Sequence, residues 1–218
     1  SSFEEEFAKY IGVDHVIGVG SGTDALCLAL LALNIGHADE VIAPSHTAVA
    51  TIAAIEMAGA IPVLVDIDPV YYTISPEAIK KAITRRTKAV IAVHLYGQPA
   101  GMEEILDVAK NHKIKVIEDC AQAHGTRIGK KHVGNFGEIG TFSFFPGKNL
   151  GGFGDGGAIV TNSKKIAQYC LRYRNHGALK KYDHNFSGGN SRLDTIQAGV
   201  LNIKLKNYNR ALNKRNYL

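Results

Sequence analysis

Short, continuously apolar runs alternate with segments of helical period from the start of the chain to about residue 175, and this alternation restricts the possible folds. The predicted strands are residues 16–19, 41–44, 61–66, 89–94, 116–119, 140–145 and 158–161. Predicted helices at 24–33, 47–58, 76–83 and 102–112 separate the first five strands. Apolar strands that alternate with helices form mostly parallel sheets covered on both faces. We therefore predict a three-layer α/β/α fold, in which the last two strands, with no helix between them, include an antiparallel one.

Composition and charge fit an ordinary globular domain. The chain has 218 residues, 45% of them hydrophobic, which is enough for one large core. The net charge of +5 is small, and the basic residues gather only near the end of the chain, at Lys204, Lys206, Arg210, Lys214 and Arg215. No aromatic-studded basic groove accompanies them, so we interpret this segment as a solvated helix face and predict no nucleic-acid partner.

Other residue patterns argue against a metal site, a membrane span and a secreted protein. None of the nine histidines has the spacing of a metal-binding pair, and no metal is predicted. Cys27, Cys120 and Cys170 are isolated and are predicted to be free buried thiols of a reducing compartment, which indicates a cytoplasmic location. The longest apolar run, 25–33, is shorter than the ~20 residues of a membrane span. The acidic, amphipathic segment 1–10 is not a signal peptide.

Polar side chains follow several predicted strands, and in such sheets ligands bind beyond the carboxyl ends of the strands. The segment 20–24, Gly-Ser-Gly-Thr-Asp, opens a helix directly after the first strand. Free amides of a first helical turn and the helix dipole favour an anion there. Ser21 or Thr23 could instead serve only as a helix cap, although a cap and a phosphate can share the same amides.

Asp119 ends an apolar strand, and Glu118 is expected to point to the opposite face of the sheet. An unpaired buried charge is costly, so Asp119 needs a cationic partner. A structural salt bridge would provide one. A protonated pyridine nitrogen would be another, and its protonation makes a heteroaromatic ring an electron sink.

Lys148 follows the apolar segment that contains Phe142, Phe144 and Phe145, and it begins a glycine-rich loop. Apolar neighbours could lower the pKa of its amine and make it a nucleophile or a Schiff-base former, whereas the alternative is a solvated loop lysine. A phosphate cradle, a carboxylate and a lysine on successive strand ends together describe a site for pyridoxal 5′-phosphate.

Motifs throughout the chain resemble the sugar aminotransferases of the DegT/DnrJ/EryC1/StrS group, which have the fold type I architecture. They are Ser-Gly-Thr-Asp-Ala-Leu (21–26), Val-His-Leu-Tyr-Gly-Gln-Pro-Ala (93–100), Glu-Asp-Cys-Ala-Gln-Ala-His-Gly (118–125), Thr-Phe-Ser-Phe-Phe-Pro-Gly-Lys-Asn-Leu-Gly (141–151), Gly-Asp-Gly-Gly-Ala-Ile-Val-Thr (154–161) and Asn-Ser-Arg-Leu-Asp (190–194). The resemblance implies that residues 1–218 are the large cofactor domain, without a further N-terminal segment and the small C-terminal domain that relatives have.

The resemblance also implies a role for each matching residue. Lys148 would hold pyridoxal phosphate as a Schiff base and shuttle the proton between the substrate carbon and the cofactor. Asp119 would pair with the pyridinium nitrogen, and Gln122 would lie near the phenolate oxygen. The expected phosphate ligands are Gly22, Thr23 and Ser143, with Asn190 reaching the phosphate of a neighbouring subunit in a homodimer.

The family reaction moves an amino group from L-glutamate to a keto sugar on a nucleoside diphosphate. Segments 146–151 and 174–184 are most similar to relatives that aminate C3 of a thymidine-diphosphate-linked 3-keto-6-deoxyhexose, with C4 amination as the alternative. Tyr182 and His184 are candidate sugar or donor contacts, unless they belong to a mobile surface loop.

Many relatives carry a ring-stacking aromatic where this chain has Ala48, and His46 could supply a planar group instead. His46 could equally lie at the surface, with Ser45 or Thr47 capping the helix.

Two other functions are considered. One is a sugar dehydratase of the same family, in which histidine replaces the lysine, so Lys148 argues against it. The other is a non-catalytic cofactor-binding or regulatory homologue, which the complete set of site residues disfavours.

Overall fold

A computed structural model describes residues 1–180 and 182–217 of the chain, so that Lys181 and Leu218 lie outside the described residues. The strands of the central sheet are β1 (His15–Val19), β2 (Glu40–Pro44), β3 (Ile61–Val65), β4 (Thr87–Val93), β5 (Lys115–Asp119), β8 (Ile139–Ser143) and β9 (Gly157–Thr161). Two short hairpins consist of β6 (Arg127–Ile128) with β7 (Lys131–His132), and of β10 (Ala178–Lys180) with β11 (Asp183–His184). The helices are α1 (Ser2–Ile11), α2 (Gly22–Ala32), α3 (Val49–Met57), α4 (Pro76–Ala82), the 3₁₀ turn η1 (Leu95–Gly97), α5 (Met102–His112), α6 (Lys164–Tyr173), α7 (Thr195–Lys206) and α8 (Tyr208–Tyr217).

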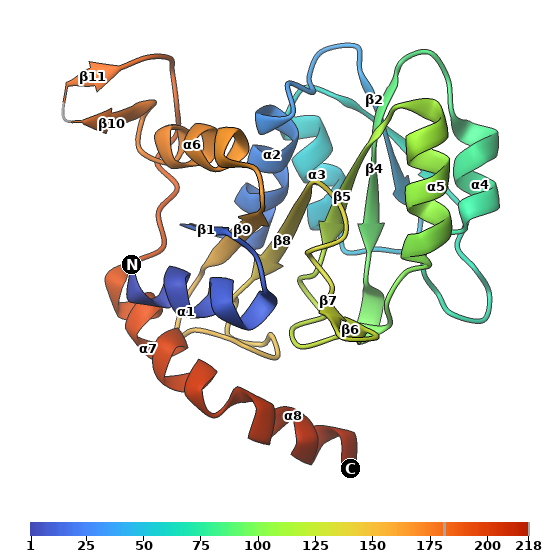
Figure 1. Ribbon diagram of the computed structural model, residues 1–218. Helices are drawn as coiled ribbons and strands as arrows, with labels where there is room; N and C mark the ends of the chain where they lie inside the picture. The colour runs from blue at the N-terminus through green and yellow to red at the C-terminus, as the bar shows by residue number, and fades with distance from the viewer. Residues whose placement is uncertain (181, 218) are drawn as a thin grey trace.

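The sheet has the strand order β1-β9-β8-β5-β4-β2-β3 (Figure 1). Strands β8, β5, β4, β2 and β3 run parallel to one another, and β9 is antiparallel to both β8 and β1. This confirms the predicted mostly parallel sheet and the antiparallel strand near its end. A strand that follows its predecessor without a crossover helix can only return in the opposite direction.

Helices cover both faces of the sheet and give the predicted three layers. Helices α2, α3 and α6 pack on one face, where Ile117 of β5 lies in the core. Helices α4 and α5 cover the other face around Val116, and α1, α7 and α8 continue that layer over β8 and β9. Adjacent residues of β5 thus face opposite layers, as the two-residue period of a strand requires.

Helix α1 shows how the local sequence fixes such a layer. Ser1 and Glu4 form a capping box at its start, and Gly12 ends it with a φ of 82°, a left-handed conformation that glycine adopts readily. Phe3, Phe7 and Ile11 recur every fourth residue, and all three are buried against the sheet.

The edge of the sheet at β3 differs from the prediction of complete coverage. Ile61 and Leu64 of β3 are exposed, as are Val49 and Met57 at the two ends of α3. Apart from Thr51 and Glu56, every residue of α3 is apolar, which is typical of a helix that is covered on all sides. Within the described chain, this face of α3 and β3 is uncovered.

No helix among residues 1–180 and 182–217 is long and apolar enough to cross a membrane. The three cysteines are buried and free, as predicted.

Candidate functional site

The start of α2 lies against the end of β8. Ser21 is the N-cap of α2, and its Oγ accepts a hydrogen bond of 3.0 Å from the Asp24 amide. A Cβ added at Gly22 would lie 2.7 Å from Cβ of Ser143, so only glycine permits this approach. The structure therefore brings the first-turn amides at Gly22 and Thr23 next to the buried Ser143, which is a suitable arrangement for an anion.

His124 fixes the position of Ser143, although the sequence analysis did not identify it. Its Nε2 donates a hydrogen bond of 2.8 Å to the Ser143 carbonyl oxygen. Burial lowers the pKa of His124 to about 4, so the ring is neutral at physiological pH. A buried neutral histidine with one fixed donor acts here as a support for the end of β8.

Asp119 lies at the end of β5 and is buried. Its Oδ2 accepts a hydrogen bond of 3.0 Å from the Thr51 hydroxyl, and its Oδ1 accepts one of 3.1 Å from the Ala121 amide. Burial raises the pKa of this carboxyl, while these two hydrogen bonds and the charge of Lys148 oppose the rise. The described residues give Asp119 no ion pair, so the salt-bridge alternative has no partner among them.

Lys148 lies in the loop after β8 and is half-buried. Its backbone amide donates to the Phe145 carbonyl at 2.8 Å, which closes a turn that directs the chain back toward the sheet. The charge of Lys148 lowers the pKa of both Asp119 and His124, and the loop that carries it follows β8, the neighbour of β5 in the sheet. The predicted lysine, carboxylate and phosphate cradle are thus gathered at one edge of the sheet.

Two basic residues of the C-terminal helices hold this loop. Lys204 donates a hydrogen bond of 2.6 Å from Nζ to the Gly151 carbonyl oxygen, and Arg215 donates one of 3.2 Å to the Asn149 carbonyl oxygen. Both residues are exposed, in agreement with the predicted solvated face, and they also contact the loop that carries Lys148.

Gln122 and His46 are connected through Tyr96. The Gln122 Oε1 accepts a hydrogen bond of 2.8 Å from the Tyr96 amide, and the Tyr96 hydroxyl lies 3.2 Å from Nε2 of His46. His46 is exposed, and neither Ser45 nor Thr47 caps α3, whose N-cap is Ala48 without a side-chain hydrogen bond. Stacking by His46 on a ring stays a prediction.

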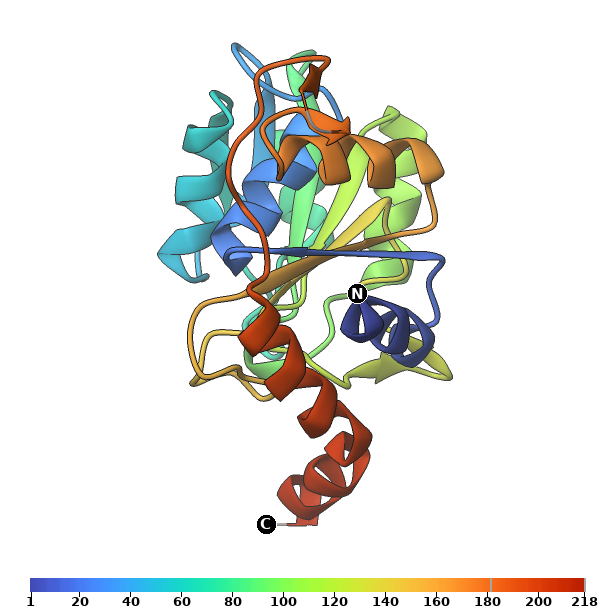
Figure 2. The same cartoon turned by 90° about the vertical axis from the view of Figure 1, so that its left-hand side faces the viewer.

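The structure does not bring Tyr182 and His184 to the strand ends, whereas Asn190 precedes Ser191, whose Oγ accepts a hydrogen bond from the Gly20 amide and donates one to Asp24 at the start of α2. The hairpin of β10 and β11, which carries Tyr182 and His184, lies at the end of the molecule opposite to α8, whereas the arrowheads of β4 and β8 point toward the end where α8 lies (Figures 1 and 2). Asn190 lines a pocket together with Asp24 and Met57, beside α2. Any role of these three residues in the site of this chain stays a prediction.

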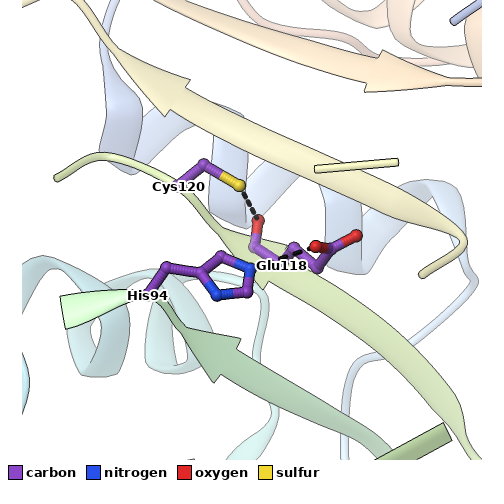
Figure 3. Close-up of side chains that lie close together, drawn as sticks. All are labelled: His94, Glu118 and Cys120. Carbon is purple, nitrogen blue, oxygen red and sulfur yellow. Dashed lines mark hydrogen bonds and ion pairs between the residues drawn. The ribbon is translucent and has the colours of Figure 1, made fainter. Parts of the chain in front are cut away.

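A second buried polar cluster, behind the strand ends, consists of His94, Glu118 and Cys120 (Figure 3). The Ala100 amide donates to Nδ1 of His94, so the ring proton is on Nε2, which donates to Glu118 Oε2 at 3.0 Å. Backbone amides supply three further donors to the Glu118 carboxylate, from Gly134, Phe136 and Gly137. Four donors saturate a carboxylate. We therefore interpret the cluster as structural and not as a metal site.

Replacing Glu118 with glutamine is expected to destabilise the fold by about 3 kcal/mol. The NH₂ group of the glutamine would face backbone N–H groups, and it cannot accept hydrogen bonds from them. The measurement is urea denaturation followed by circular dichroism. Glu77→Gln, on the exposed surface of α4, is the matched control and should leave the midpoint nearly unchanged. Equal midpoints for the two variants would contradict the buried network.

Three features define the class of site that holds a phosphorylated pyridine cofactor. They are a helix start suited to an anion, a buried carboxylate without an ion-pair partner among the described residues, and a lysine on a glycine-rich loop. Comparison with known proteins agrees with this geometry. The model of the DegT/DnrJ/EryC1/StrS aminotransferase family matches residues 1–218, and the chain belongs to this family.

Individual relatives are also similar to this chain. A dTDP-3-amino-3,4,6-trideoxy-alpha-D-glucose transaminase of Streptomyces venezuelae is 49% identical over 93% of this chain and 54% of its own length. A UDP-N-acetyl-3-dehydro-alpha-D-glucosamine 3-aminotransferase of Acidithiobacillus ferrooxidans is 52% identical over 92% of this chain and 54% of its own length. The structure of NtdA from Bacillus subtilis, with bound cofactor PMP, superimposes with a TM-score of 0.90 at 38% identity, over 97% of this chain and 48% of that one. The chain spans about half the length of the curated relatives it matches.

The cofactor of this family is pyridoxal phosphate, and the residues present fit it. The close approach of Gly22 to Ser143 leaves helix amides available to a phosphate, and Asp119 is a buried carboxylate whose described partners are all neutral donors. A pyridinium nitrogen would supply the missing cation.

Proposed function

We propose that this chain is part of a pyridoxal-phosphate-dependent aminotransferase that transfers an amino group from L-glutamate to a keto group of a nucleoside-diphosphate-linked hexose. The observation that carries the proposal is that the neighbouring strands β5 and β8 end in the buried Asp119 and in Ser143, which lies against Gly22, and that Lys148 follows β8 in the next loop. In the same proposal residues 1–218 form the large, cofactor-binding part of a cytoplasmic enzyme of deoxyamino-sugar biosynthesis.

Each site residue has one task in this mechanism. Amides at Gly22 and Thr23 and the Ser143 hydroxyl bind the phosphate, and Gln122 lies on the side of the ring oxygen. Asp119 keeps the pyridine nitrogen protonated, and the Lys148 amine attaches the cofactor and moves the proton at the substrate carbon. When bound, the cofactor supplies an electron sink for the negative charge that develops at that carbon.

The favoured acceptor is a thymidine-diphosphate-linked 3-keto-6-deoxyhexose, with a 4-keto sugar as the alternative. The name of the Streptomyces relative supports thymidine diphosphate, and that of the Acidithiobacillus relative supports uridine diphosphate and amination at C3. His46, which contacts Tyr96 beside Gln122, is the candidate substrate contact within this chain, whereas Tyr182 and His184 would have to act at another subunit's site.

A homodimer is part of the proposal. The apolar face of α3 and β3, with Val49 82% and Leu64 53% exposed, needs a cover, and a second copy of the chain would provide one. Asn190 lines the same pocket as Met57 of α3, so a partner that covers this face would bring Asn190 toward its phosphate.

The test uses protein that has been loaded with pyridoxal phosphate. L-glutamate alone should remove the yellow absorption of the protein, and the correct keto sugar should restore it with release of the amino sugar. Thymidine and uridine diphosphate sugars with keto groups at C3 or C4 would identify the acceptor. A yellow protein that glutamate does not bleach would instead indicate a non-catalytic binder, and a colourless one would overturn cofactor binding.

A further inference from the structure

Thr51 is a buried hydroxyl directed at Asp119. It is the third residue of α3 and is fully buried, and its Oγ1 donates to Oδ2 of Asp119 at 3.0 Å. The Thr47 hydroxyl lies 2.9 Å from the same Oγ1. Because a threonine hydroxyl has one hydrogen, and that of Thr51 is given to Asp119, Thr47 must donate to Thr51. Two hydroxyls thus form a chain of donors that ends on the carboxylate.

The sequence around α3 shows that the hydrogen bond between Thr47 and Thr51 takes the place of an ordinary helix cap. Helix N-caps prefer serine or threonine, but the N-cap of α3 is Ala48, which has no side-chain hydrogen bond. Thr47, one residue earlier, could have capped the helix and instead bonds to Thr51. The hydroxyl is therefore used to orient a neighbour of Asp119 and not to stabilise the helix end.

We propose that Thr51, supported by Thr47, is a positioning residue that holds the Asp119 carboxylate ionised and fixed in orientation toward the pyridinium nitrogen of the cofactor. The inference rests on the proposed function. Thr51 occupies one lone pair of Oδ2 and the Ala121 amide one of Oδ1, so each carboxylate oxygen keeps a lone pair for a cation.

The surroundings of Asp119 make its pKa sensitive to the Thr51 hydroxyl. Burial raises the pKa of the carboxyl, and the hydrogen bonds from Ala121 and Thr51 lower it. The other titratable groups near it are His94 after β4, whose ring is neutral because its Nδ1 accepts from the Ala100 amide, and Lys148 in the loop after β8, whose charge lowers the pKa of Asp119. Cys120 also neighbours Asp119, and burial raises the pKa of its thiol, so it is uncharged. Removal of the Thr51 donor should therefore raise the pKa of Asp119.

The first experiment titrates Asp119 in cofactor-free protein by the ¹³C resonance of its carboxyl group, which Asp119→Asn assigns. Thr51→Val should raise the titration midpoint by about one pH unit, and Thr51→Ser, which keeps the hydroxyl, should restore it. If Thr51→Val does not fold, the smaller Thr51→Ala carries the same expectation. The inference would be overturned if Thr51→Val or Thr51→Ala had the wild-type midpoint. It would also be overturned if Thr51→Ser shifted the midpoint as much as Thr51→Val.

The second experiment adds pyridoxal phosphate and records the yellow absorption as the pH is lowered. Ionised Asp119 would strengthen retention of the cofactor, so the acidic limit of the yellow absorption should move upward in Thr51→Val, in the same direction as the carboxyl midpoint. The carboxyl midpoint could move in Thr51→Val while the acidic limit of the yellow absorption stays at the wild-type pH. That result would overturn the role of Thr51 in cofactor binding. A wild-type chain that stays colourless would overturn the proposed function, and the carboxyl titration would still decide whether Thr51 controls Asp119.

Discussion

Lys148→Ala is expected to leave the protein folded and colourless with pyridoxal phosphate, and to lower amine transfer by about 10⁴-fold or more. The variant loses both the amine that attaches the cofactor and the group that moves the proton. The fold should persist because Lys148 lies in a loop and makes no ion pair among the described residues. Absorption spectra and a coupled assay of amine transfer measure the two effects.

The control for this variant is Lys130→Ala, in the exposed turn between β6 and β7. It removes the same charge from an exposed turn and should keep colour and activity. A Lys148→Ala protein that stays yellow after dialysis and gel filtration would show that another group attaches the cofactor, and would contradict the assignment of Lys148.

Asp119→Asn is expected to lower amine transfer by about 10²- to 10³-fold while the protein still binds the cofactor phosphate. Asparagine keeps the size of the side chain and removes the negative charge that holds a proton on the pyridine nitrogen. The pH dependence should change as well, because the variant has no carboxyl to protonate at the acidic end of the profile. Single-turnover rates with L-glutamate over a range of pH measure both effects.

Asp107→Asn, on the exposed surface of α5, is the matched control and should behave like wild type. If the asparagine at position 119 left the rate unchanged, the carboxylate would have only a structural role, and the proposed electron-sink chemistry would lose its main support.

The fold was predictable because its signal is local and repeated. Apolar runs such as 41–44 and 89–94 are strands in the structure, and Pro76 and the surrounding polar residues mark the start of α4 where the sequence places it. The coverage of β3 was not predictable, since an apolar strand has the same sequence pattern whether a helix of its own chain or another molecule covers it.

The site was predictable for residues that lie directly at strand ends, because parallel strands carry Gly22, Asp119 and Lys148 to one edge. Thr51 and His124 escaped prediction for the opposite reason. Each acts through one side-chain contact that depends on the packing of a helix or loop against the sheet, and a threonine in an apolar helix carries no pattern that distinguishes it. The preference of Thr47 for Thr51 over the helix end could have been suspected from the alanine at the N-cap position.

The hold of the C-terminal helices on the Lys148 loop has a consequence for the order in which the protein assembles. The hydrogen bonds from Lys204 and Arg215 join segments that are 53 and 66 residues apart, and Gln197 accepts another from the Phe153 amide across 44 residues. During synthesis from the N-terminus, α7 and α8 emerge well after the sheet strands, which can already pair. The loop that carries Lys148 therefore gains these three hydrogen bonds only after the helices that follow it have docked. A nascent chain would have its phosphate cradle and carboxylate before it could capture the cofactor covalently.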